Sequence, residues 1–370
     1  MKTLLITSDF PPLKGGVANV NDNIVNHWPE KDKMFVLVDD ANAVKNAKDE
    51  NLNVIRRNMS LKHIWPHWLP ALFFLFKEIS EKKISHVIVG QLLPFGTITW
   101  LVSFVLRIRY SVIIHGMELP LAFRNSRKKF LAKKIINGAN QIICPNNYVA
   151  EQVRAIINNK EKVTVVYPGV NVDLKCSIAE TQKLRDKLGL NGKTLMLSLH
   201  RMVRRKGTDM VLEALPQIKE LFPDLVYAVV GNGPDKKALQ EQAKKYDNVI
   251  FADCHTDEEK WRWFCACDFF IMPSRDIDGD FEGFGIVYLE ANLIGKAVIA
   301  GDSGGVREAV IHEYNGLMVD PNKPDSIANA VIRLCKDPQL RFKLGEQGRA
   351  RVIKDFDWGG QVRKIYEIIK

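Results

Sequence analysis

The stretch RDIDGDFEGFGIVYLEAN, residues 275–292, decides the fold, because it runs from a polar loop straight into an apolar helix. Gly283 and Gly285 allow a tight turn that exposes backbone amides at the helix start, where the helix dipole favours an anion such as phosphate. Glu282 and Glu290 lie eight residues apart on either side of that start, about 12 Å along a helix. One carboxylate could then meet a sugar and the other a ribose at opposite ends of a diphosphate. A surface loop with an incidental acid is the alternative, since Gly-x-Gly before a helix is weak evidence alone.

Short apolar strands alternate with helical segments on both sides of this stretch. In the first half the pattern runs from Thr3–Thr7 to Val163–Val166. In the second half the expected strands are Leu195–Leu199, Val226–Val230, Val249–Phe251, Phe269–Met272 and Val298–Ala300. Such alternation predicts an α/β protein built on doubly wound parallel sheets.

The chain of 370 residues is long enough for two domains of roughly 150–200 residues each. Turn-forming residues in YPGVNVD, 167–173, break the rhythm and predict a hinge near 168–178. We expect an N-terminal domain over 1–170, a C-terminal domain over 171–355, and a helix over 356–370 that packs back toward the N-terminal domain. Ligands of open α/β sheets bind beyond the carboxyl ends of the strands, so the crevice between two such domains is the expected site.

The formal charge of +10 comes from the first half of the chain. Residues 1–170 carry 23 Lys and Arg against 13 Asp and Glu, whereas residues 171–370 carry 30 against 30. A one-sided basic half points to a polyanionic partner, which could be nucleic acid, an anionic membrane leaflet or a phosphorylated substrate. No nucleic-acid-binding motif accompanies the charge, so nucleic acid is not an expected partner.

The cysteines and the apolar segments favour a cytoplasmic protein. The six cysteines, at 144, 176, 254, 265, 267 and 335, show no C-x-x-C spacing, so reduced thiols are the simplest expectation. The start MKTLLITSDFPP is typical of a first strand rather than a signal peptide. The apolar stretches Ile64–Phe76 and Leu92–Leu106 are broken by proline or glycine and are shorter than the roughly 18–20 residues of a membrane span.

Loops at the expected strand ends carry further candidate residues. Gly15 and Gly16 open the first helix and could admit a phosphate, and His115 follows a strand in His-Gly-Met-Glu. HRMVRRKG, 200–207, crowds four cations just before a helix, where they oppose its dipole unless an anion compensates them. Gly231-Asn232-Gly233 suits the close approach of a base or ribose. Plain turns, a core histidine and a solvated basic loop are the corresponding alternatives.

Together these pieces resemble the retaining glycosyltransferases of family 4, which have the GT-B architecture of two facing Rossmann-like domains. The matching pieces fall in family order over nearly the whole chain: FPPLKGG at 10–16, HG at 115–116, YPGVNVD at 167–173, the Arg201 and Lys206 pair, GNGP at 231–234, EGFGIVYLE at 282–290 and SGGVRE at 303–308.

The resemblance implies a role for each motif residue. Arg201 and Lys206 would neutralise the diphosphate of a nucleotide-sugar donor as it leaves, Glu282 would bind the donor sugar, and His115 would lie beside the transferred sugar. Glu290 would hold the ribose, and Gly16 would close over the diphosphate from the other domain. The full set of implied donor-binding residues is Gly15, Gly16, Gly231, Asn232, Gly233, Phe284, Gly285, Ile286 and Glu290.

No cofactor and no metal are expected, because cations and helix amides would take the place of a metal at the leaving diphosphate. The DxD-like run Asp276-Ile-Asp278 lacks further ligands and is interpreted as a solvated loop. The resemblance weakly favours GDP-mannose as donor over UDP-glucose or UDP-N-acetylglucosamine. A phosphorylase is disfavoured because no site marks out its pyridoxal-phosphate lysine, and a non-catalytic sugar-nucleotide-binding protein is the remaining rival.

The acceptor is expected to be a glycan or a lipid-linked molecule bound by the N-terminal half. That half carries a run of cations without an acid between them: Arg124, Arg127, Lys128, Lys129, Lys133 and Lys134. Trp65, Trp68 and Trp100 lie in apolar stretches of the same half. Basic and aromatic residues together favour peripheral attachment to an anionic membrane leaflet, although a solvated helix face with core tryptophans fits equally well.

Overall fold

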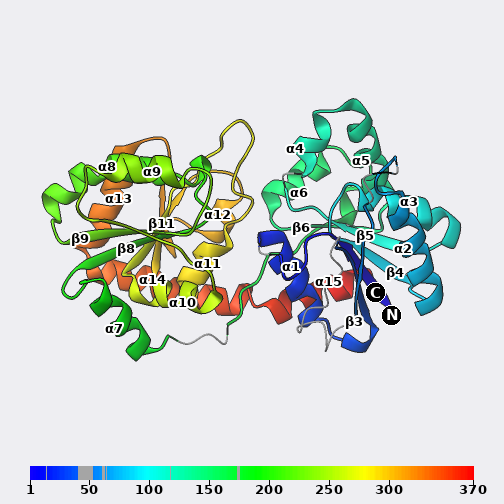
Figure 1. Ribbon diagram of the computed structural model, residues 1–370, viewed down its shortest axis with the longest axis horizontal. Coiled ribbons are helices and arrows are strands. Elements are labelled where there is room, and N and C mark those ends of the chain that lie inside the picture. Colours follow the sequence, from blue (N-terminus) through cyan, green and yellow to red (C-terminus); the bar gives the residue numbers. More distant parts are fainter. Residues whose placement is uncertain (14, 41–52, 61–62, 64, 117, 173–175) are drawn as a thin grey trace. The chain divides into compact units, whose positions relative to one another are not determined.

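A computed structural model describes residues 1–370 except 14, 41–52, 61–62, 64, 117 and 173–175. The chain forms two compact units, one of Met1–Gly169 with Trp358–Lys370 and the other of Val170–Asp357 (Figure 1). Several residues in the quoted motifs, namely Lys14, Ile64, Met117 and Asp173, lie outside the described residues, as does the middle of the predicted hinge.

The first unit is built on a parallel sheet in the order β3-β2-β1-β4-β5-β6-β7. Its strands are β1 (Thr3–Thr7), β2 (Met34–Asp39), β3 (Asn53–Arg57), β4 (His86–Val89), β5 (Arg109–Ile113), β6 (Gln141–Cys144) and β7 (Val163–Val165). Successive buried residues alternate between the two sheet faces, as the strand period of two requires: Leu4 and Ile6 pack on one face and Leu5 on the other.

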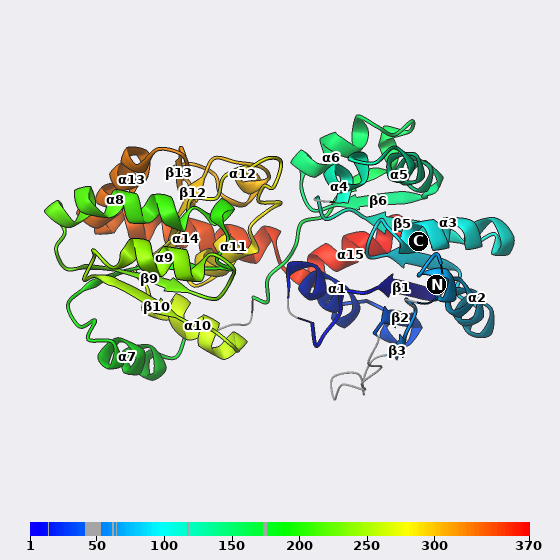
Figure 2. The ribbon, with the colours of Figure 1, turned by 45° about the horizontal axis from the view of Figure 1, so that its top comes forward.

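Helices cover both faces of this sheet (Figure 2). The core on the Leu4 face takes in residues of α2 (Leu69–Lys82), α3 (Phe95–Leu106), α5 (Ser126–Gly138) and α6 (Asn147–Arg154). The core on the Leu5 face is formed with α1 (Gly16–Asn26) and the C-terminal helix α15 (Trp358–Ile369). The short helix α4 (Glu118–Phe123) and the 3-10 turns η1 (Lys31–Lys33) and η3 (Lys160–Lys162) complete the described elements of this unit.

The C-terminal helix α15 is anchored in the first unit by polar and aromatic contacts. The Tyr366 hydroxyl donates to Glu30 Oε2 at 2.8 Å, and the Tyr366 ring meets Trp28 edge-on at 5.5 Å. The backbone N–H of Tyr167 donates to Gln361 Oε1 at 3.1 Å. The last residues of the chain thus complete the core of the unit that the first residues begin.

The second unit has a parallel sheet in the order β10-β9-β8-β11-β12-β13. Its strands are β8 (Thr194–Leu199), β9 (Leu225–Val230), β10 (Val249–Ala252), β11 (Phe269–Met272), β12 (Ala297–Gly301) and β13 (Gly316–Val319). The sequence pattern did not predict β13, because this short strand begins with a glycine and contains no long apolar run. The adjacent strands β9, β8, β11 and β12 direct their carboxyl ends to one edge of the sheet.

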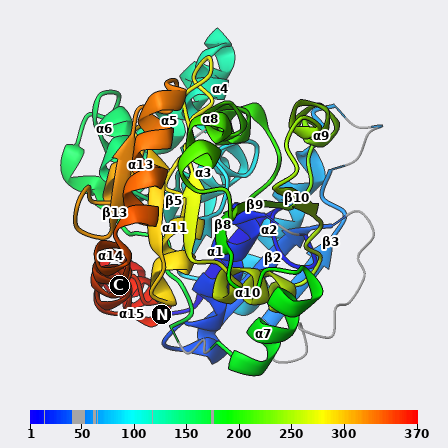
Figure 3. The ribbon, with the colours of Figure 1, turned by 90° about the vertical axis from the view of Figure 1, so that its left-hand side faces the viewer.

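Helices of the second unit also lie on both sheet faces (Figures 1 and 3). One face is covered by α8 (Thr208–Leu221), α9 (Lys236–Ala243) and α13 (Pro324–Lys336). The other carries α10 (Asp257–Ala266), α11 (Ile286–Leu293) and α14 (Pro338–Asp355), with Phe264 and Tyr288 meeting Phe270 of β11. The remaining elements are α7 (Ile178–Lys187), α12 (Val306–Ala309) and the 3-10 turn η4 (Arg204–Lys206).

The expectation that all cysteines are reduced is wrong for one pair. Cys176 and Cys265 form a disulfide that joins the segment before α7 to α10, across 89 residues of sequence. Sequence spacing could not show the pairing, because the two thiols approach only when α7 packs against α10. The free cysteines among the described residues are Cys144, Cys254, Cys267 and Cys335.

Candidate functional site

The loops that follow β8, β9, β11 and β12 gather at the carboxyl edge of the second unit's sheet. Three backbone contacts join them: Met202 N–H donates to Asn232 O at 2.9 Å, Arg275 N–H to Arg205 O at 2.8 Å, and Gly305 N–H to Glu282 O at 3.0 Å. The strand order, rather than closeness in sequence, therefore brings HRMVRRKG, GNGP, the 275–285 loop and SGGVRE to one place.

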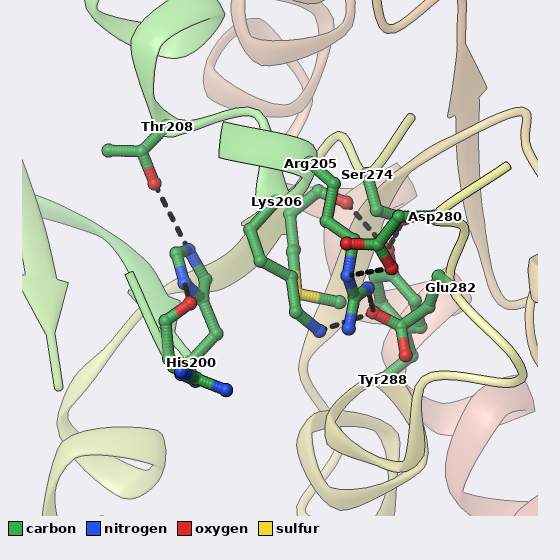
Figure 4. Close-up of polar contacts among 10 residues, drawn as sticks. His200, Arg205, Lys206, Thr208, Ser274, Asp280, Glu282 and Tyr288 are labelled. Atoms are coloured by element: carbon green, nitrogen blue, oxygen red, sulfur yellow. Dashed lines mark hydrogen bonds and ion pairs between the residues drawn. The ribbon is translucent and has the colours of Figure 1, made fainter. Parts of the chain in front are cut away.

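An ion cluster centred on Glu282 is the most concentrated group of charges at this edge (Figure 4). Glu282 Oε2 accepts from Lys206 Nζ and, at 2.9 Å, from Arg205 Nη1. The Arg205 Nε lies 3.0 Å from Asp280 Oδ1, so one guanidinium joins two acids of the same loop. Lys206 is buried and the Glu282 side chain is only 12% exposed, so both charges depend on the pairing.

The two cations determine the ionisation of Glu282. Burial raises the pKa of this carboxyl, but the charges and hydrogen bonds of Lys206 and Arg205 outweigh it and hold the pKa below its ordinary value. Glu282 is therefore a carboxylate at neutral pH and can accept hydrogen bonds but not donate them.

His200, at the end of β8, is a neutral member of the same edge. Burial and the nearby charge of Lys206 lower the pKa of the imidazole to about 3. Its Nε2 is 3.1 Å from the Thr208 hydroxyl, and its Nδ1 is 3.0 Å from the carbonyl oxygen of Arg201 (Figure 4). A neutral imidazole adds no cation to the cluster and orients the start of the loop.

The start of α11 supplies backbone amides beside Glu282. Gly285 caps the helix with φ 84°, a left-handed conformation that favours glycine, and a Cβ there would overlap the ring of Tyr288. The Tyr288 hydroxyl donates to Met272 O at 2.6 Å, which fixes the ring against β11. Phe284 is buried and its ring lies 5.8 Å from that of Phe356. Packing on both sides of Gly285 therefore sets where α11 begins and where the backbone amides of its first turn lie.

Glu290 lies in α11, and its partner was not predicted from sequence. Lys260 Nζ, on α10, is 2.7 Å from Glu290 Oε1 and 3.4 Å from Asp257 Oδ1. Glu290 is only 8% exposed, so Lys260 neutralises a carboxylate that is almost fully buried. Lys260 is distant in sequence from both glutamates and shares no motif with them, so no sequence signal marked it.

The glycines of the GNGP loop pack against a neighbouring loop. A Cβ on Gly231 would overlap the carbonyl oxygen of His200, and one on Gly233 would overlap that of Met202. Gly231 has φ 130°, and the side-chain oxygen of Asn232 accepts from Gly233 N–H at 2.7 Å. The structure thus gives these glycines a packing role in addition to the predicted contact with a base or ribose.

The DxD-like run is an exposed turn. Asp276 and Asp278 point to solvent, and Asp276 Oδ1 accepts from Gly279 N–H at 2.8 Å. Among the residues that the structure describes, no group of three or more His, Cys, Asp or Glu side chains could hold a metal ion.

In the first unit, His115 lies at the carboxyl end of β5. Its backbone N–H donates to Glu118 Oε2 at 2.6 Å, and its Nε2 lies 3.0 Å from Gly90 O at the end of β4. Glu118 Oε1 also accepts from Leu92 N–H at 3.3 Å, and burial raises the pKa of this carboxyl. Glu118 therefore ties together the two loops that orient the histidine.

Gly15 and Gly16 stand at the start of α1 on the same unit. Both are exposed, and a Cβ on either would meet no described atom within 4 Å. The fold of the unit does not itself require glycine at these positions, so their predicted approach to a phosphate remains a prediction.

The structure brings Lys206 and Glu282 together and places Glu290 on the helix that begins beside them. It also shows a cation that the predicted pair omitted, because Arg205 rather than Arg201 contacts Glu282. Arg201 is exposed and forms no ion pair with a described residue. The sequence placed both arginines in one crowded loop but carried no signal of which would point inward.

Two family models match the chain. Residues 180–351 match "Glycosyl transferases group 1", and residues 14–174 match "Glycosyltransferase Family 4".

Whole-length relatives and solved structures agree with these matches. The GDP-mannose-dependent monoacylated alpha-(1-6)-phosphatidylinositol monomannoside mannosyltransferase of Corynebacterium glutamicum is 30% identical over 100% of this chain and 98% of its own length. The GDP-mannose-dependent alpha-(1-6)-phosphatidylinositol monomannoside mannosyltransferase of Mycolicibacterium smegmatis is 28% identical over 99% of this chain and 97% of its own. The crystal structure of Anabaena Alr3699/HepE in complex with UDP has the same fold, with a TM-score of 0.84 and 21% identity over 100% of this chain and 99% of that one.

Proposed function

The chain belongs to glycosyltransferase family 4, whose members are retaining enzymes of the GT-B fold that use nucleotide sugars, and we propose that its donor is GDP-mannose and its acceptor a glycan or lipid-linked molecule. The observation that carries the proposal is the Glu282 cluster, in which the buried Lys206 and the partly buried Arg205 lie beside the start of α11 at one edge of the sheet. A non-catalytic sugar-nucleotide-binding protein is the alternative, and it would bind the donor without hydrolysing it.

The preference for mannose rests on the relatives. Two enzymes named as GDP-mannose-dependent mannosyltransferases match this chain over nearly its whole length. The structural neighbour from Anabaena was solved with UDP and UDP-glucose, but its 21% identity speaks for the fold alone. A UDP-glucose or UDP-N-acetylglucosamine transferase is the alternative within the family.

The geometry supports a division of tasks within the second unit. Lys206 and the amides at the start of α11 would bind the diphosphate, and Arg201, exposed in the same loop, would join them. Glu282 would accept hydrogen bonds from sugar hydroxyls, and Glu290 from the ribose. For the first unit we propose that Gly15 and Gly16 approach the diphosphate and that His115 lies beside the transferred sugar.

The proposed reaction needs no metal and no protein nucleophile. The bond from the sugar's anomeric carbon to the leaving phosphate breaks while a bond to the acceptor oxygen forms on the same face. The acceptor's hydroxyl proton passes to an oxygen of the leaving diphosphate, so protons and charge balance. Negative charge grows on the diphosphate and positive charge on the sugar ring. In this proposal Lys206 and the helix amides would stabilise the first and Glu282 the second.

Replacing Glu282 and replacing Glu290 should change different kinetic parameters. Glu282→Ala should lower the turnover of GDP-mannose hydrolysis about 100-fold without weakening GDP binding, because the carboxylate acts on the sugar. Glu290→Ala should mainly raise the KM for GDP-mannose, about tenfold or more, because a charged hydrogen bond to the ribose is lost. Steady-state kinetics and calorimetric GDP binding would measure both.

Asp276→Ala, an exposed acid of the same loop, is the matched control and should leave both parameters unchanged. The opposite pattern for the two glutamates would show that their assignments are exchanged. A loss of activity in Asp276→Ala would contradict the metal-independent mechanism.

Donor choice predicts an order of stabilisation by nucleotides. Each of GDP, UDP and ADP is added at equal concentration and the shift in melting temperature is compared. A ligand present at 100 times its dissociation constant stabilises the folded chain by about 2.7 kcal/mol, so the tightest binder gives the largest shift. We expect GDP to give it, whereas a larger shift with UDP would reject the mannose proposal in favour of the UDP-sugar alternative.

We propose in addition that the first unit binds an anionic membrane through the outer surface of α2, α3 and α5. These helices cover one face of the sheet, and large apolar side chains on their outer surface remain exposed. The most exposed are Phe73 (65%), Phe104 (66%), Val105 (71%) and Phe130 (60%). By contrast, Trp68 and Trp100 pack against the core, so of the three tryptophans considered only Trp65 is strongly exposed.

Cations lie along α5 and the residues before it, beside one of these apolar side chains. All six basic residues of 124–134 are exposed, and no acidic residue lies among them. Lys134 Nζ lies 5.5 Å from the ring centre of Phe130, so charge and aromatic surface are presented together. Inserted aromatics flanked by cations suit an anionic lipid surface. No helix of the described residues is long and apolar enough to cross a membrane.

Vesicle sedimentation tests whether this surface, rather than another part of the molecule, binds lipid. We expect the chain to bind phosphatidylglycerol vesicles and not phosphatidylcholine vesicles, and Phe73→Ser or Phe104→Ser to weaken binding about tenfold, as lost burial of one ring predicts. Phe342→Ser removes an equally exposed phenylalanine from α14 of the other unit and should change nothing. Equal recovery of the protein with both kinds of vesicle, or equal effects of all three variants, would show that this surface does not bind the membrane.

A further inference from the structure

Arg205 has contacts that the predicted roles leave unexplained. Its guanidinium spans two acids, with Nη1 2.9 Å from Glu282 Oε2 and Nε 3.0 Å from Asp280 Oδ1. Its side chain is 22% exposed, whereas its neighbour Arg204 faces solvent. Arg205 is therefore part of the built cluster, and Arg204 is not.

The backbone around Arg205 is fixed independently of the donor. Arg275 N–H donates to Arg205 O at 2.8 Å, and the Arg275 guanidinium pairs with Asp209 in the first turn of α8. Asp280 is presented by a tight turn in which Ile277 and Asp280 exchange backbone hydrogen bonds at 3.1 and 2.9 Å. The backbone at Arg205 and at Asp280 is thus held by contacts within the protein that do not involve a donor.

When a donor binds, Glu282 and the donor's diphosphate compete for Lys206. In the structure its ammonium is bound to Glu282, yet the proposed reaction needs it at the diphosphate. Moving it away would remove one of the two cations from a carboxylate that is 12% exposed. An unpaired buried carboxylate is costly and takes up a proton instead, which would end its use as an acceptor for sugar hydroxyls.

We propose that Arg205 is a positioning residue that keeps Glu282 ionised and in place when Lys206 turns to the donor's diphosphate. The proposal rests on the proposed function. Asp280 holds the guanidinium by a second contact, so Arg205 remains beside Glu282 while Lys206 changes partner. In this way Lys206 can bind the diphosphate while Arg205 stays with the Glu282 carboxylate.

The electrostatics of the cluster agree with this geometry. Burial raises the pKa of Glu282, and the charges of Lys206 and Arg205 lower it to below its ordinary value. Among the described residues, Tyr288 on α11 and His200 on the β8 loop also sense the charge of Glu282, and burial keeps both neutral. Asp280 adds a second negative charge to the cluster, 3.0 Å from Arg205 Nε. Without Arg205, Lys206 is the one cation among the described residues that still pairs with this carboxylate.

The test measures protons taken up when GDP binds, by calorimetry at pH 6 in buffers of different ionisation enthalpy, with UDP in a parallel arm. We expect Arg205→Gln to take up measurably more protons on binding than the wild-type chain, with one proton per chain as the upper limit, because losing the adjacent cation raises the pKa of the Glu282 carboxyl once Lys206 has left it. Arg204→Gln is the matched control and should behave as wild type. Arg205→Lys, which keeps the charge, should restore most of the wild-type value.

A second variant identifies the site of protonation. Glu282→Gln combined with Arg205→Gln should abolish the extra uptake, and Asp280→Asn, at an exposed acid, should cause a smaller uptake of the same sign if Arg205→Gln does not fold. Equal uptake by the wild type and by the variants that weaken Arg205 would overturn the inference. If the wild-type chain bound neither GDP nor UDP, the proposed function itself would fail and the inference with it.

Discussion

A carboxylate removed from water needs a cation beside it, and this constraint organises the second unit. Glu282 meets it with Lys206 and Arg205, which come from the loop after a neighbouring strand. The pairing fixes the 275–285 loop against the β8 loop and sets the position of the amides at the start of α11. Glu290, eight residues further along the chain in α11, is paired in the same way with Lys260 as its cation. In the candidate donor site, the two largely buried acids Glu282 and Glu290 therefore each have a positive partner.

Much of the fold follows from local sequence pattern, and the site follows only in part. Alternating apolar runs predicted the two parallel sheets, because the spacing of apolar residues in a strand or a helix is a local feature of the sequence. Glycine and charge at strand ends predicted Lys206, Glu282 and Glu290 as site residues. Arg205, Lys260 and the Cys176–Cys265 disulfide were beyond reach, because each depends on which helix packs beside which and not on any local pattern.

Net charge and buried ion pairs point to different units of the chain. The basic excess of residues 1–170 lies in part on an outer surface with exposed aromatics, where it suits a lipid headgroup. The electrically balanced second half holds the buried ion pairs that suit a diphosphate and a sugar. Net charge therefore indicates a surface partner, whereas the site is marked by charges that are buried and paired.

The central claim is that the Glu282 cluster and the start of α11 receive the donor's diphosphate. The most direct measurement is a crystal structure of the chain with GDP bound. The account predicts diphosphate oxygens within hydrogen-bonding distance of Lys206 Nζ and of the first amides of α11, with Glu282 still held by Arg205. A diphosphate bound elsewhere, with Lys206 still paired to Glu282, would contradict it.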